Sequence, residues 1–480
     1  MSTTTTEGAA KRGWPGYNAI WRWHFYAGLF CIPFILWLPI TGSIYLFKPQ
    51  IEAWLERPYE QLQVTGARAS AETQVEAALA AMPGSVLNSY ELPATPHSAV
   101  RVLVGHGTDL FRIYVHPETL QILKQESEDG RLMNLLFYLH GEFLLGTPGS
   151  MLVELAASWT IMLFITGLYL WWPRNTQGLA GIVYPRLGRG GRIFWRDLHS
   201  VTGLWISFFT LFLLISGLPW ATSWGGMLQE LREIGASTVV KQDWSTGQAS
   251  DLERRQAMNT PASAVSGHAG HQLDEQYAGK AVAGYDYSGL DRMIATVQAL
   301  HLAPPVLIAP PSKDAPAWVP VSKTDWTARS ESQNRPLRVN LVLDERTGAI
   351  KSREDFADRP LLDRIIGIGV AAHEGQLFGW PNQALGLFTA MGLMLMTVSS
   401  IVMWWRRRSP GTLGAPKATR VLPRFSIVLI VIIVFLGLIL PLLGISILVV
   451  AIIERWILQS FPATREFLGL NCASSTDLPA

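Results

Sequence analysis

The sequence is poor in charge. Only 16% of its 480 residues are Asp, Glu, Lys or Arg, whereas 49% are hydrophobic. Because a soluble globular domain has roughly 25% charged residues, this composition indicates an integral membrane protein. The formal net charge of +2 gives no reason to expect nucleic acid as a partner.

Cysteines are equally scarce. Cys31 and Cys472 are too few for a disulfide framework, and the sequence has no CxxCH motif that would attach a haem covalently. The N-terminal stretch MSTTTTEGAAKRG has no cleavable signal pattern, and the first apolar segment is long enough to stay in the membrane as an anchor. We therefore expect the apolar segments to define the architecture.

Four apolar segments reach the roughly 20 residues that a transmembrane helix needs. They cover residues 24–47, 151–173, 200–222 and 383–405. A fifth segment, 426–453, has Pro441 in its middle and could be one long kinked helix or a hairpin of two short helices. We favour one kinked span.

Lys and Arg residues set the expected orientation. They gather before the first span, between the second and third, and after the fourth, and such flanks stay in the cytoplasm. The long loops 48–150 and 223–382 then face the periplasm. The full expected order is a cytoplasmic N-terminus 1–23, first span 24–47, outer loop 48–150, second span 151–173, cytoplasmic loop 174–199, third span 200–222, outer loop 223–382, fourth span 383–405, cytoplasmic loop 406–425, C-terminal transmembrane segment 426–453 and tail 454–480.

Each outer loop has the pattern of a small α+β module. In the first loop, a helical pattern over 71–82 precedes strand-like segments at 100–104 and 111–115. In the second, a helical pattern over 290–300 precedes strand-like VPVS (319–322) and LRVNLVL (337–343). Alternating apolar residues bounded by turn residues predict strands. Residues 245–290, rich in Ser, Gly, Ala and Gln, look like an insertion.

Two copies of one unit are visible in the sequence. HFYAGLF (24–30) and HSVTGLW (199–205) share a histidine, a glycine four residues later and a following Leu-aromatic pair. Thr41–Gly42 and Ser216–Gly217 follow the two histidines at the same offsets of 17 and 18 residues. His140 and His373 are each followed 31 residues later by a tryptophan. Internal duplication in a membrane protein commonly places the functional site between the copies.

The orientation sorts these histidines into two pairs. His24 and His199 lie at the cytoplasmic ends of spans one and three, and His140 and His373 lie at the outer approaches to spans two and four. Two histidines near each membrane face suit two non-covalent haems, each held from both axial sides within a four-helix bundle. A single interfacial histidine is usually only a polar residue, but four at matched offsets favour a functional role.

Glycine and arginine residues near these histidines are further candidates for the haem sites. Gly28 and Gly203 would leave a helix surface without a Cβ beside a flat macrocycle, although glycine also serves helix packing. Arg22 and Arg196 on the inner side, with Arg131 and Arg364 on the outer side, could pair with haem propionates. Ordinary topology-setting charge is an equal alternative for these arginines.

Several motifs together resemble the PepSY-associated transmembrane family. They are LLFYLHGEFLLG (135–146), WRDLHSVTGLW (195–205), AAHEGQLFGWPNQALG (371–386) and a Trp-Trp pair followed by arginine. The resemblance extends over about residues 14–460. It implies a bacterial inner-membrane protein of the ferric-siderophore reductase type, with two periplasmic PepSY modules and b-type haems held by His24, His140, His199 and His373.

The expected fold is therefore a membrane-embedded α-helical bundle of four haem-binding transmembrane helices, with a C-terminal apolar segment and two α+β periplasmic modules. The expected activity is that of an oxidoreductase that takes electrons from a cytoplasmic reductant or a quinol and reduces a periplasmic ferric siderophore, which releases Fe(II). One alternative is a PepSY-type membrane sensor or peptidase regulator without redox activity. A transporter is a third possibility, against which the expected absence of Asp, Glu, Lys and Arg from the four spans argues.

Overall fold

The computed structural model describes residues 16–173, 178–234, 287–311, 325–416 and 427–470. The chain divides into two compact units. Unit 1 comprises the chain up to Pro39, Glu154–Leu214 and the chain from Met391, and unit 2 comprises Ile40–Val153 and Ile215–Ala390. The predicted VPVS strand at 319–322 and almost all of the predicted insertion at 245–290 lie outside the described residues.

Four of the described helices are long and apolar enough to cross a membrane. They are α1 (Tyr17–Tyr45), α5 (Thr147–Trp171), α6 (Gly190–Gly217, continued by the 3-10 turn η1, Leu218–Trp220) and α11 (Trp380–Arg407), as four predicted segments required. Helices α1 and α6 begin well before the predicted starts at residues 24 and 200. Helices can continue through Tyr, Trp and Arg residues at a membrane boundary. The apolar runs in the sequence therefore predicted the membrane-spanning part of each helix but not the residue at which the helix begins.

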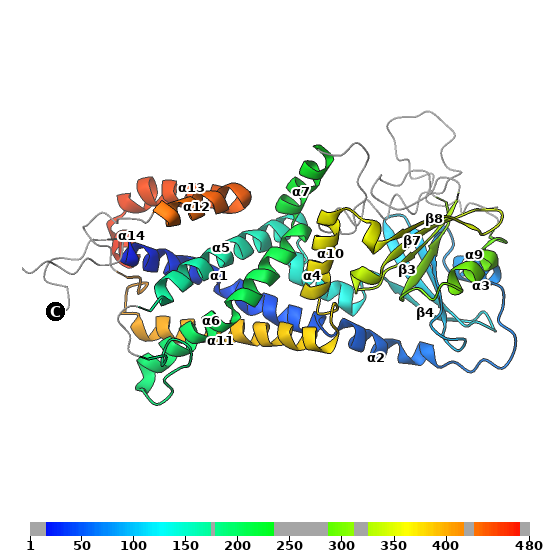
Figure 1. Cartoon of the computed structure of the whole chain (residues 1–480), viewed down its shortest axis with the longest axis horizontal. Coiled ribbons are helices and arrows are strands. Elements are labelled where there is room, and N and C mark those ends of the chain that lie inside the picture. Colours follow the sequence, from blue (N-terminus) through cyan, green and yellow to red (C-terminus); the bar gives the residue numbers. More distant parts are fainter. Residues whose placement is uncertain (1–15, 174–177, 235–286, 312–324, 417–426, 471–480) are drawn as a thin grey trace, which may run out of the picture. The chain divides into compact units, whose positions relative to one another are not determined.

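The described residues of unit 2 form an eight-stranded antiparallel sheet. Its strands are β1 (Val86–Glu91), β2 (Val100–His106), β3 (Asp109–Val115), β4 (Ile122–Ser127), β5 (Val306–Ala309), β6 (Trp326–Ser330), β7 (Val339–Leu343) and β8 (Ile350–Asp355). The order across the sheet is β4-β3-β2-β1-β5-β6-β7-β8, and Figure 1 shows several of these strands together.

The two predicted outer modules therefore share one sheet. Each contributes four consecutive strands, and they join where β1 pairs with β5 through Tyr90↔Ile308 and Glu91↔Leu307. This pairing satisfies two strand edges that would otherwise expose unpaired backbone groups. In both halves the strands follow one helix and precede another. The first outer half is α3 (Ala71–Ala81), β1–β4 and α4 (Leu132–Glu142), and the second is α9 (Leu290–Gln298), β5–β8 and α10 (Leu361–His373).

Helices α3 and α9 lie side by side against this sheet (Figure 1). Leu290, Met293 and Val297 recur at intervals of three and four along α9, which places them on one helix face, and all three belong to the main apolar core. Val75 of α3 and Trp326 of β6 lie in the same core. The core thus holds both halves together through side chains from each.

Shorter helices follow the first and third long helices. Helix α2 (Lys48–Glu60) comes after α1, and α7 (Thr222–Ile234) comes after α6 and η1. Two short 3-10 turns, η3 (Arg335–Leu337) and η4 (Phe356–Asp358), flank β7 and β8. Helix α10 packs against η3, and η3 packs against η4.

The C-terminal apolar segment is sharply bent. It forms α12 (Ile427–Ile439) and α13 (Pro441–Ile452), and the chain bends by 117° between them. The two helices lie side by side in Figure 1. A bend of this size occurs in a broken span and in a re-entrant hairpin alike, so the preferred interpretation, one kinked span, stays a prediction. Pro441 cannot donate the helical hydrogen bond, and Gly437 and Gly444 let the two helices approach closely. A π-helical turn (Ile453–Ile457), a 3-10 turn (Leu458–Ser460) and α14 (Pro462–Phe467) follow.

Candidate functional site

In unit 1, two of the four predicted histidines face each other. His24 on α1 and His199 on α6 have ring centroids 6.5 Å apart, and their ring planes are nearly perpendicular at 88°. Both side chains are partly buried. Two residues that are 175 positions apart in the sequence are thus brought together, as the matched HxxxGL motifs predict.

The Nδ1 atoms of both rings are held by hydrogen bonds. His24 Nδ1 lies 3.0 Å from Thr166 Oγ1, and that hydroxyl donates its proton to Met162 O at 2.8 Å. The hydroxyl must therefore accept from an Nδ1–H of His24. His199 Nδ1 lies 3.0 Å from the carbonyl oxygen of Met396, which can only accept. Both rings consequently carry hydrogen on Nδ1, and Nε2 has the lone pair that a metal would bind.

The distance between these rings would accommodate one metal ion held by the two imidazoles. With metal–nitrogen bonds of about 2.0 Å, two such rings on opposite sides of one ion would have centroids about 6 Å apart, close to the observed 6.5 Å. The described residues contain no group of three or more His, Cys, Asp or Glu that could hold a metal ion. A haem, whose macrocycle supplies the other ligands of its iron, would need only two such imidazoles from the protein.

In unit 2, the other two histidines are held in the same way. His140 Nδ1 on α4 lies 2.9 Å from Thr41 Oγ1, and His373 Nδ1 at the end of α10 lies 3.1 Å from Ser216 Oγ. The hydroxyl residues are the ones found at matched offsets in the sequence. Each is followed by a glycine whose missing Cβ would lie 3.2–3.3 Å from the Cε1 atom of the same imidazole ring.

The hydroxyl–glycine pair recurs a third time, where the sequence reading missed it. Gly167 follows Thr166, and a Cβ there would lie 3.2 Å from His24 Cε1. At the fourth histidine, Ser399 Oγ lies 3.4 Å from His199 Nδ1, and Ser400 stands in the place of the glycine. Each histidine thus packs against a hydroxyl residue from the other half of its own sequence copy.

Aromatic rings surround the second pair. The Trp220 ring lies 5.8 Å from the His373 ring and 6.4 Å from the Phe137 ring. Phe137 lies on α4, one turn before His140. Trp220 therefore contacts both helices that carry the histidines of unit 2.

The predicted glycines have packing neighbours in the structure. A Cβ at Gly28 would lie 3.9 Å from Leu163 Cδ2, and a Cβ at Gly203 would lie 3.0 Å from Met396 Sδ. The glycines that lie against histidine rings are instead Gly42, Gly167 and Gly217. A contact of Gly28 or Gly203 with a macrocycle stays a prediction.

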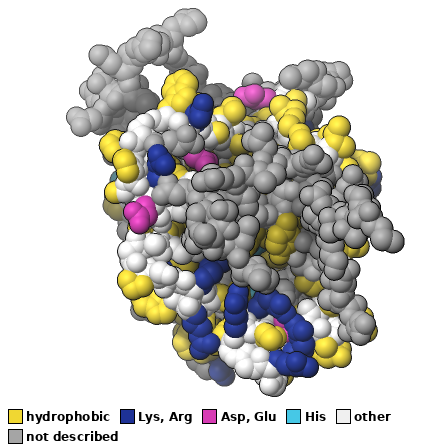
Figure 2. All heavy atoms as spheres, turned by 90° about the vertical axis from the view of Figure 1, so that its left-hand side faces the viewer, with side chains coloured by type: hydrophobic (Ala, Val, Ile, Leu, Met, Phe, Trp, Pro, Cys, Tyr) yellow, Lys and Arg dark blue, Asp and Glu magenta, His cyan; other side chains and the backbone are white. Residues whose placement is uncertain are grey.

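The predicted inner arginines already have protein partners. Arg22 donates to Pro416 O and, at 2.7 Å, to Gly469 O, and Arg196 pairs with the buried Asp197 at 2.8 Å. Figure 2 shows that Lys and Arg side chains gather on one part of the face that it draws. Unit 1 has exposed arginines near the start of α6, at Arg189 and Arg192, and near the end of α11, at Arg406 and Arg408. A role toward propionates stays a prediction.

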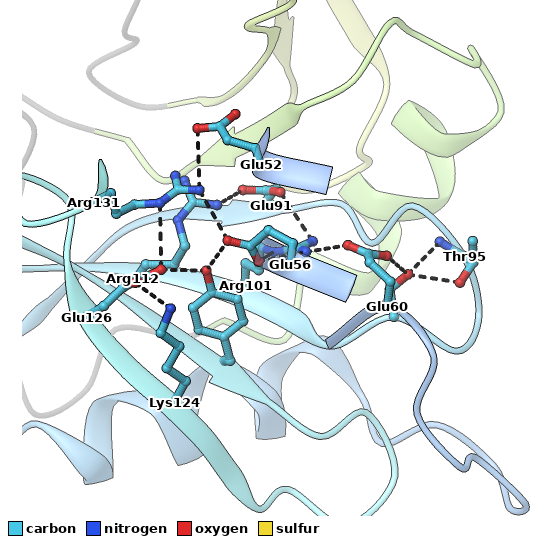
Figure 3. A network of polar contacts seen from close by, with 12 residues as sticks. Glu52, Glu56, Glu60, Glu91, Thr95, Arg101, Arg112, Lys124, Glu126 and Arg131 are labelled. Atoms are coloured by element: carbon cyan, nitrogen blue, oxygen red, sulfur yellow. Dashed lines mark hydrogen bonds and ion pairs between the residues drawn. The ribbon is translucent and has the colours of Figure 1, made fainter. Parts of the chain in front are cut away.

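The predicted outer arginine Arg131 belongs to a charge network that the sequence reading missed (Figure 3). Arg101 of β2, Arg112 of β3 and Arg131 before α4 pair with six carboxylates, from Glu52, Glu56, Glu60, Glu91, Glu126 and Glu128. The three glutamates of α2 recur every four residues and therefore share one helix face. This spacing is the sequence pattern from which an acidic helix face could have been predicted. Protein carboxylates thus surround Arg131.

Tyr114 lies in the middle of this network. Its hydroxyl is 2.8 Å from Glu56 Oε1 and 2.7 Å from Glu126 Oε1. Burial, together with these two carboxylates, raises the pKa of Tyr114 far above its usual value. The tyrosine therefore stays protonated and serves as a fixed hydrogen-bond donor.

An acidic residue within a span was also missed. Glu154 lies in α5 and is 2% exposed, so the expectation that no charged residue lies within the spans was wrong. Ionisable groups at membrane depth are expensive and commonly functional, so Glu154 weakens the argument against a transporter.

Comparison with known families agrees with the motifs. The model of the PepSY-associated TM region matches residues 21–407, which include all four histidines and both outer halves. A comparison with curated proteins finds no match. Because the family model covers well over half of the chain, this protein belongs to the family of the PepSY-associated TM region.

Proposed function

We propose that this protein is a di-haem membrane reductase that passes electrons from a cytoplasmic reductant or a quinol to a ferric siderophore in the periplasm. The observation that carries the proposal is the set of four hydroxyl-supported histidines. His24 and His199 also face each other at 6.5 Å, with Nε2 left as the metal-binding nitrogen of each ring. Haem iron, when bound, supplies a one-electron carrier.

Other residues of this chain would orient the four histidines that would hold the two haems. Thr166 and the Met396 carbonyl group fix the tautomers of His24 and His199. Thr41 and Ser216 hold His140 and His373. Such partners of a ligating histidine set its ring orientation and raise its basicity. Two sites along the spans would divide a hydrocarbon thickness of about 30 Å, which one site alone does not bridge.

The direction of transfer follows from the charge of the loops. The basic flanks are expected in the cytoplasm, so we expect the sheet in the periplasm. There the reaction would add one electron to Fe(III) of the chelate and give Fe(II). Hard oxygen donors hold Fe(II) less tightly, in keeping with the low position of Fe(II) in the divalent series. Iron would thereby be released for uptake.

The test is the visible spectrum and haem content of the purified full-length protein. We expect a Soret band, sharp α-bands after dithionite reduction, and two haems per chain by pyridine haemochrome assay. Acid acetone should extract them, since no CxxCH motif is present. A colourless preparation from haem-sufficient cells would contradict the proposal and favour the sensor alternative.

A second measurement addresses the substrate. Dithionite-reduced protein in oriented proteoliposomes should be reoxidised by a ferric hydroxamate or catecholate added on the periplasmic side, with ferrozine as the Fe(II) trap. If no ferric chelate reoxidises the protein while a quinone analogue does so quickly, the siderophore assignment is wrong.

A further inference from the structure

Three arginines gather around one turn of α10 in the second outer half. Gly367 marks this turn: a Cβ there would lie 2.7 Å from the Phe356 ring and 3.8 Å from Arg335 Cβ. The Arg359 guanidinium group stacks on Phe356, 5.6 Å from the ring centroid. Arg364 lies on α10 itself, one turn before Gly367. Arg335, Arg359 and Arg364 form what we term the arginine cluster.

The cluster combines burial with positive charge. Arg335 is 7% exposed and Arg359 is 8% exposed, and guanidinium groups stay charged even when buried. The Nε atom of Arg364 is buried without a hydrogen-bond partner in the described structure. The one acidic residue of α10, Asp363, pairs with Arg232 at 2.6 Å. Asp358 of η4, directly before Arg359, is the second acidic residue near these arginines. Two acidic residues, Asp358 and Asp363, thus accompany the four arginines Arg232, Arg335, Arg359 and Arg364.

The first outer half has an arginine, Arg131, at the position equivalent to Arg364, and protein carboxylates surround it. Arg131 lies nine residues before His140, and Arg364 lies nine residues before His373. Arg131 has carboxylate oxygens of four glutamates within 3.2–3.7 Å. One of these is Glu128, and strand register places the apolar Phe356 at the equivalent position of the second half. The second half thus has an aromatic ring where the first has an acid.

The cluster also reaches the histidine site. The Arg335 guanidinium group lies 6.0 Å from the centre of the Trp220 ring, and that ring lies 5.8 Å from the His373 ring. Along α10, His373 is six residues beyond Gly367, about 9 Å at 1.5 Å per residue. Exposed apolar side chains of the same helix, Leu361, Ile365 and Ile368, lie beside these charges.

We propose that the arginine cluster binds carboxylate groups of a ligand that lies next to His373. Guanidinium groups recognise carboxylates through paired, charge-assisted hydrogen bonds, and the field of several buried cations favours an anion over a neutral ligand. Two sources share this chemistry: a propionate of a haem held by His373, or a carboxylate of an incoming ferric chelate. The second role rests on the proposed function, whereas carboxylate binding itself does not.

The test measures citrate binding and haem content in parallel on the full-length protein in detergent. Citrate affinity is measured by titration calorimetry, and haem by pyridine haemochrome assay. The variants are Arg364→Gln and the double variant Arg335→Gln/Arg364→Gln. Arg353→Gln is the matched control, because this exposed arginine of the same half pairs with Asp355 at 2.8 Å. We expect the control to leave both readouts unchanged.

Two results would support the proposal and distinguish the sources. At least tenfold weaker citrate binding with unchanged haem content assigns the cluster to a free carboxylate ligand. Loss of one haem per chain, in a protein that does not bind citrate even as wild type, assigns it to a propionate. If both readouts stay unchanged in the double variant, the inference is wrong. Should the double variant fail to fold, the single Arg364→Gln variant carries the same test, since that side chain is only partly buried.

This design keeps the two proposals apart. Citrate binding needs no haem, so a colourless protein that binds citrate through the cluster would overturn the proposed reductase and leave the carboxylate site standing. A two-haem protein whose Gln variants match wild type in both readouts would do the reverse.

Discussion

The two outer halves of unit 2 share their plan but differ in their charges. Both run helix, four antiparallel strands and helix, and both end near a histidine held by a hydroxyl. Strand register makes Arg101 and Arg112 of the first half equivalent to Thr327 and Asn340 of the second. A network of buried ion pairs in one copy is thus replaced by neutral side chains in the other.

The two copies of the duplicated unit share their histidine contacts and differ in the charges on their sheet surface. The histidine, its hydroxyl partner and the adjacent small residue recur in both copies with little variation. The residues on the sheet surface differ between the copies, because neutral side chains can replace buried ion pairs without loss of stability. Function is therefore expected to follow the recurring contacts, and stability differences are expected to follow the sheet.

The largest expected effect comes from the histidines. His24→Ala and His199→Ala should each reduce haem content from two per chain to one and remove the same spectral component, because the two rings face each other. His140→Ala and His373→Ala should remove the other component. Pyridine haemochrome assay and low-temperature α-band spectra measure both. If His24→Ala and His140→Ala removed the same component, the pairing across copies would be wrong.

Buried charge gives the next largest effect. Arg101→Ala leaves three glutamates, Glu56, Glu60 and Glu91, without this partner, which should cost about 3–5 kcal/mol for a buried pair broken on one side. Thr327→Ala, at the equivalent position of the second half, changes a buried neutral side chain and should cost only about 1 kcal/mol, the typical effect of a point substitution. Thermal unfolding in detergent compares the two. Equal destabilisation would show that the network does not distinguish the halves.

Local sequence patterns predicted much of the histidine site but little of the sheet arrangement. The helical repeat places residues at matched offsets on equivalent faces, so the pairs Thr41–Gly42 and Ser216–Gly217 were visible beside their histidines. Thr166–Gly167 is the same hydroxyl–glycine pair. It was overlooked because the sequence comparison followed each chain segment only from its own histidine. The β1–β5 pairing joins residues more than 200 positions apart, and no periodicity encodes such a contact.

The charge network escaped prediction for a related reason. Arg101 and Arg112 alternate with apolar residues along their strands and read as solvent-facing positions. Only the packing of α2 against this face turns them inward, where each is less than 10% exposed. Which face of a half-exposed strand a helix covers is a tertiary property. The same holds for the arginine cluster, where Gly367 permits the close contact of Phe356 and Arg335 with α10.

A smaller effect should separate the two histidines of unit 1. Thr166→Val removes the hydroxyl that accepts from His24 Nδ1 with little change in shape, and loss of such a partner typically weakens metal affinity 10- to 100-fold. Ser399→Ala should weaken haem binding much less, because His199 Nδ1 keeps the Met396 carbonyl group at 3.0 Å. Haem dissociation to apomyoglobin measures both rates. The expectation fails if Ser399→Ala releases haem as fast as Thr166→Val.

Acid should affect the first outer half before the second, and this is the smallest expected effect. Burial alone would raise the pKa of Glu128, but Arg112 and Arg131 more than offset it and lower the pKa below its ordinary value. Arg101 and Ser98 likewise lower the pKa of Glu60 against the effect of burial. A carboxyl whose pKa is lowered by folding stabilises the fold above its unfolded pKa, roughly pH 4.3 for Glu. That stabilisation is lost as the pH falls through the folded pKa.

The second half has lowered carboxyl pKa values as well, at Asp344 beside Lys351 and at Asp355 beside Arg353. These pairs lie in water, where exposed ion pairs contribute little. Amides of β2 and β3 should therefore lose protection from hydrogen exchange below about pH 4, while those of β6 and β7 keep it, after correction for intrinsic rates. Glu128→Gln should reduce the pH dependence of the first half. Simultaneous loss in both halves would mean that the shared apolar core, rather than the charge network, sets acid stability, because Leu341 and Ile113 belong to one cluster.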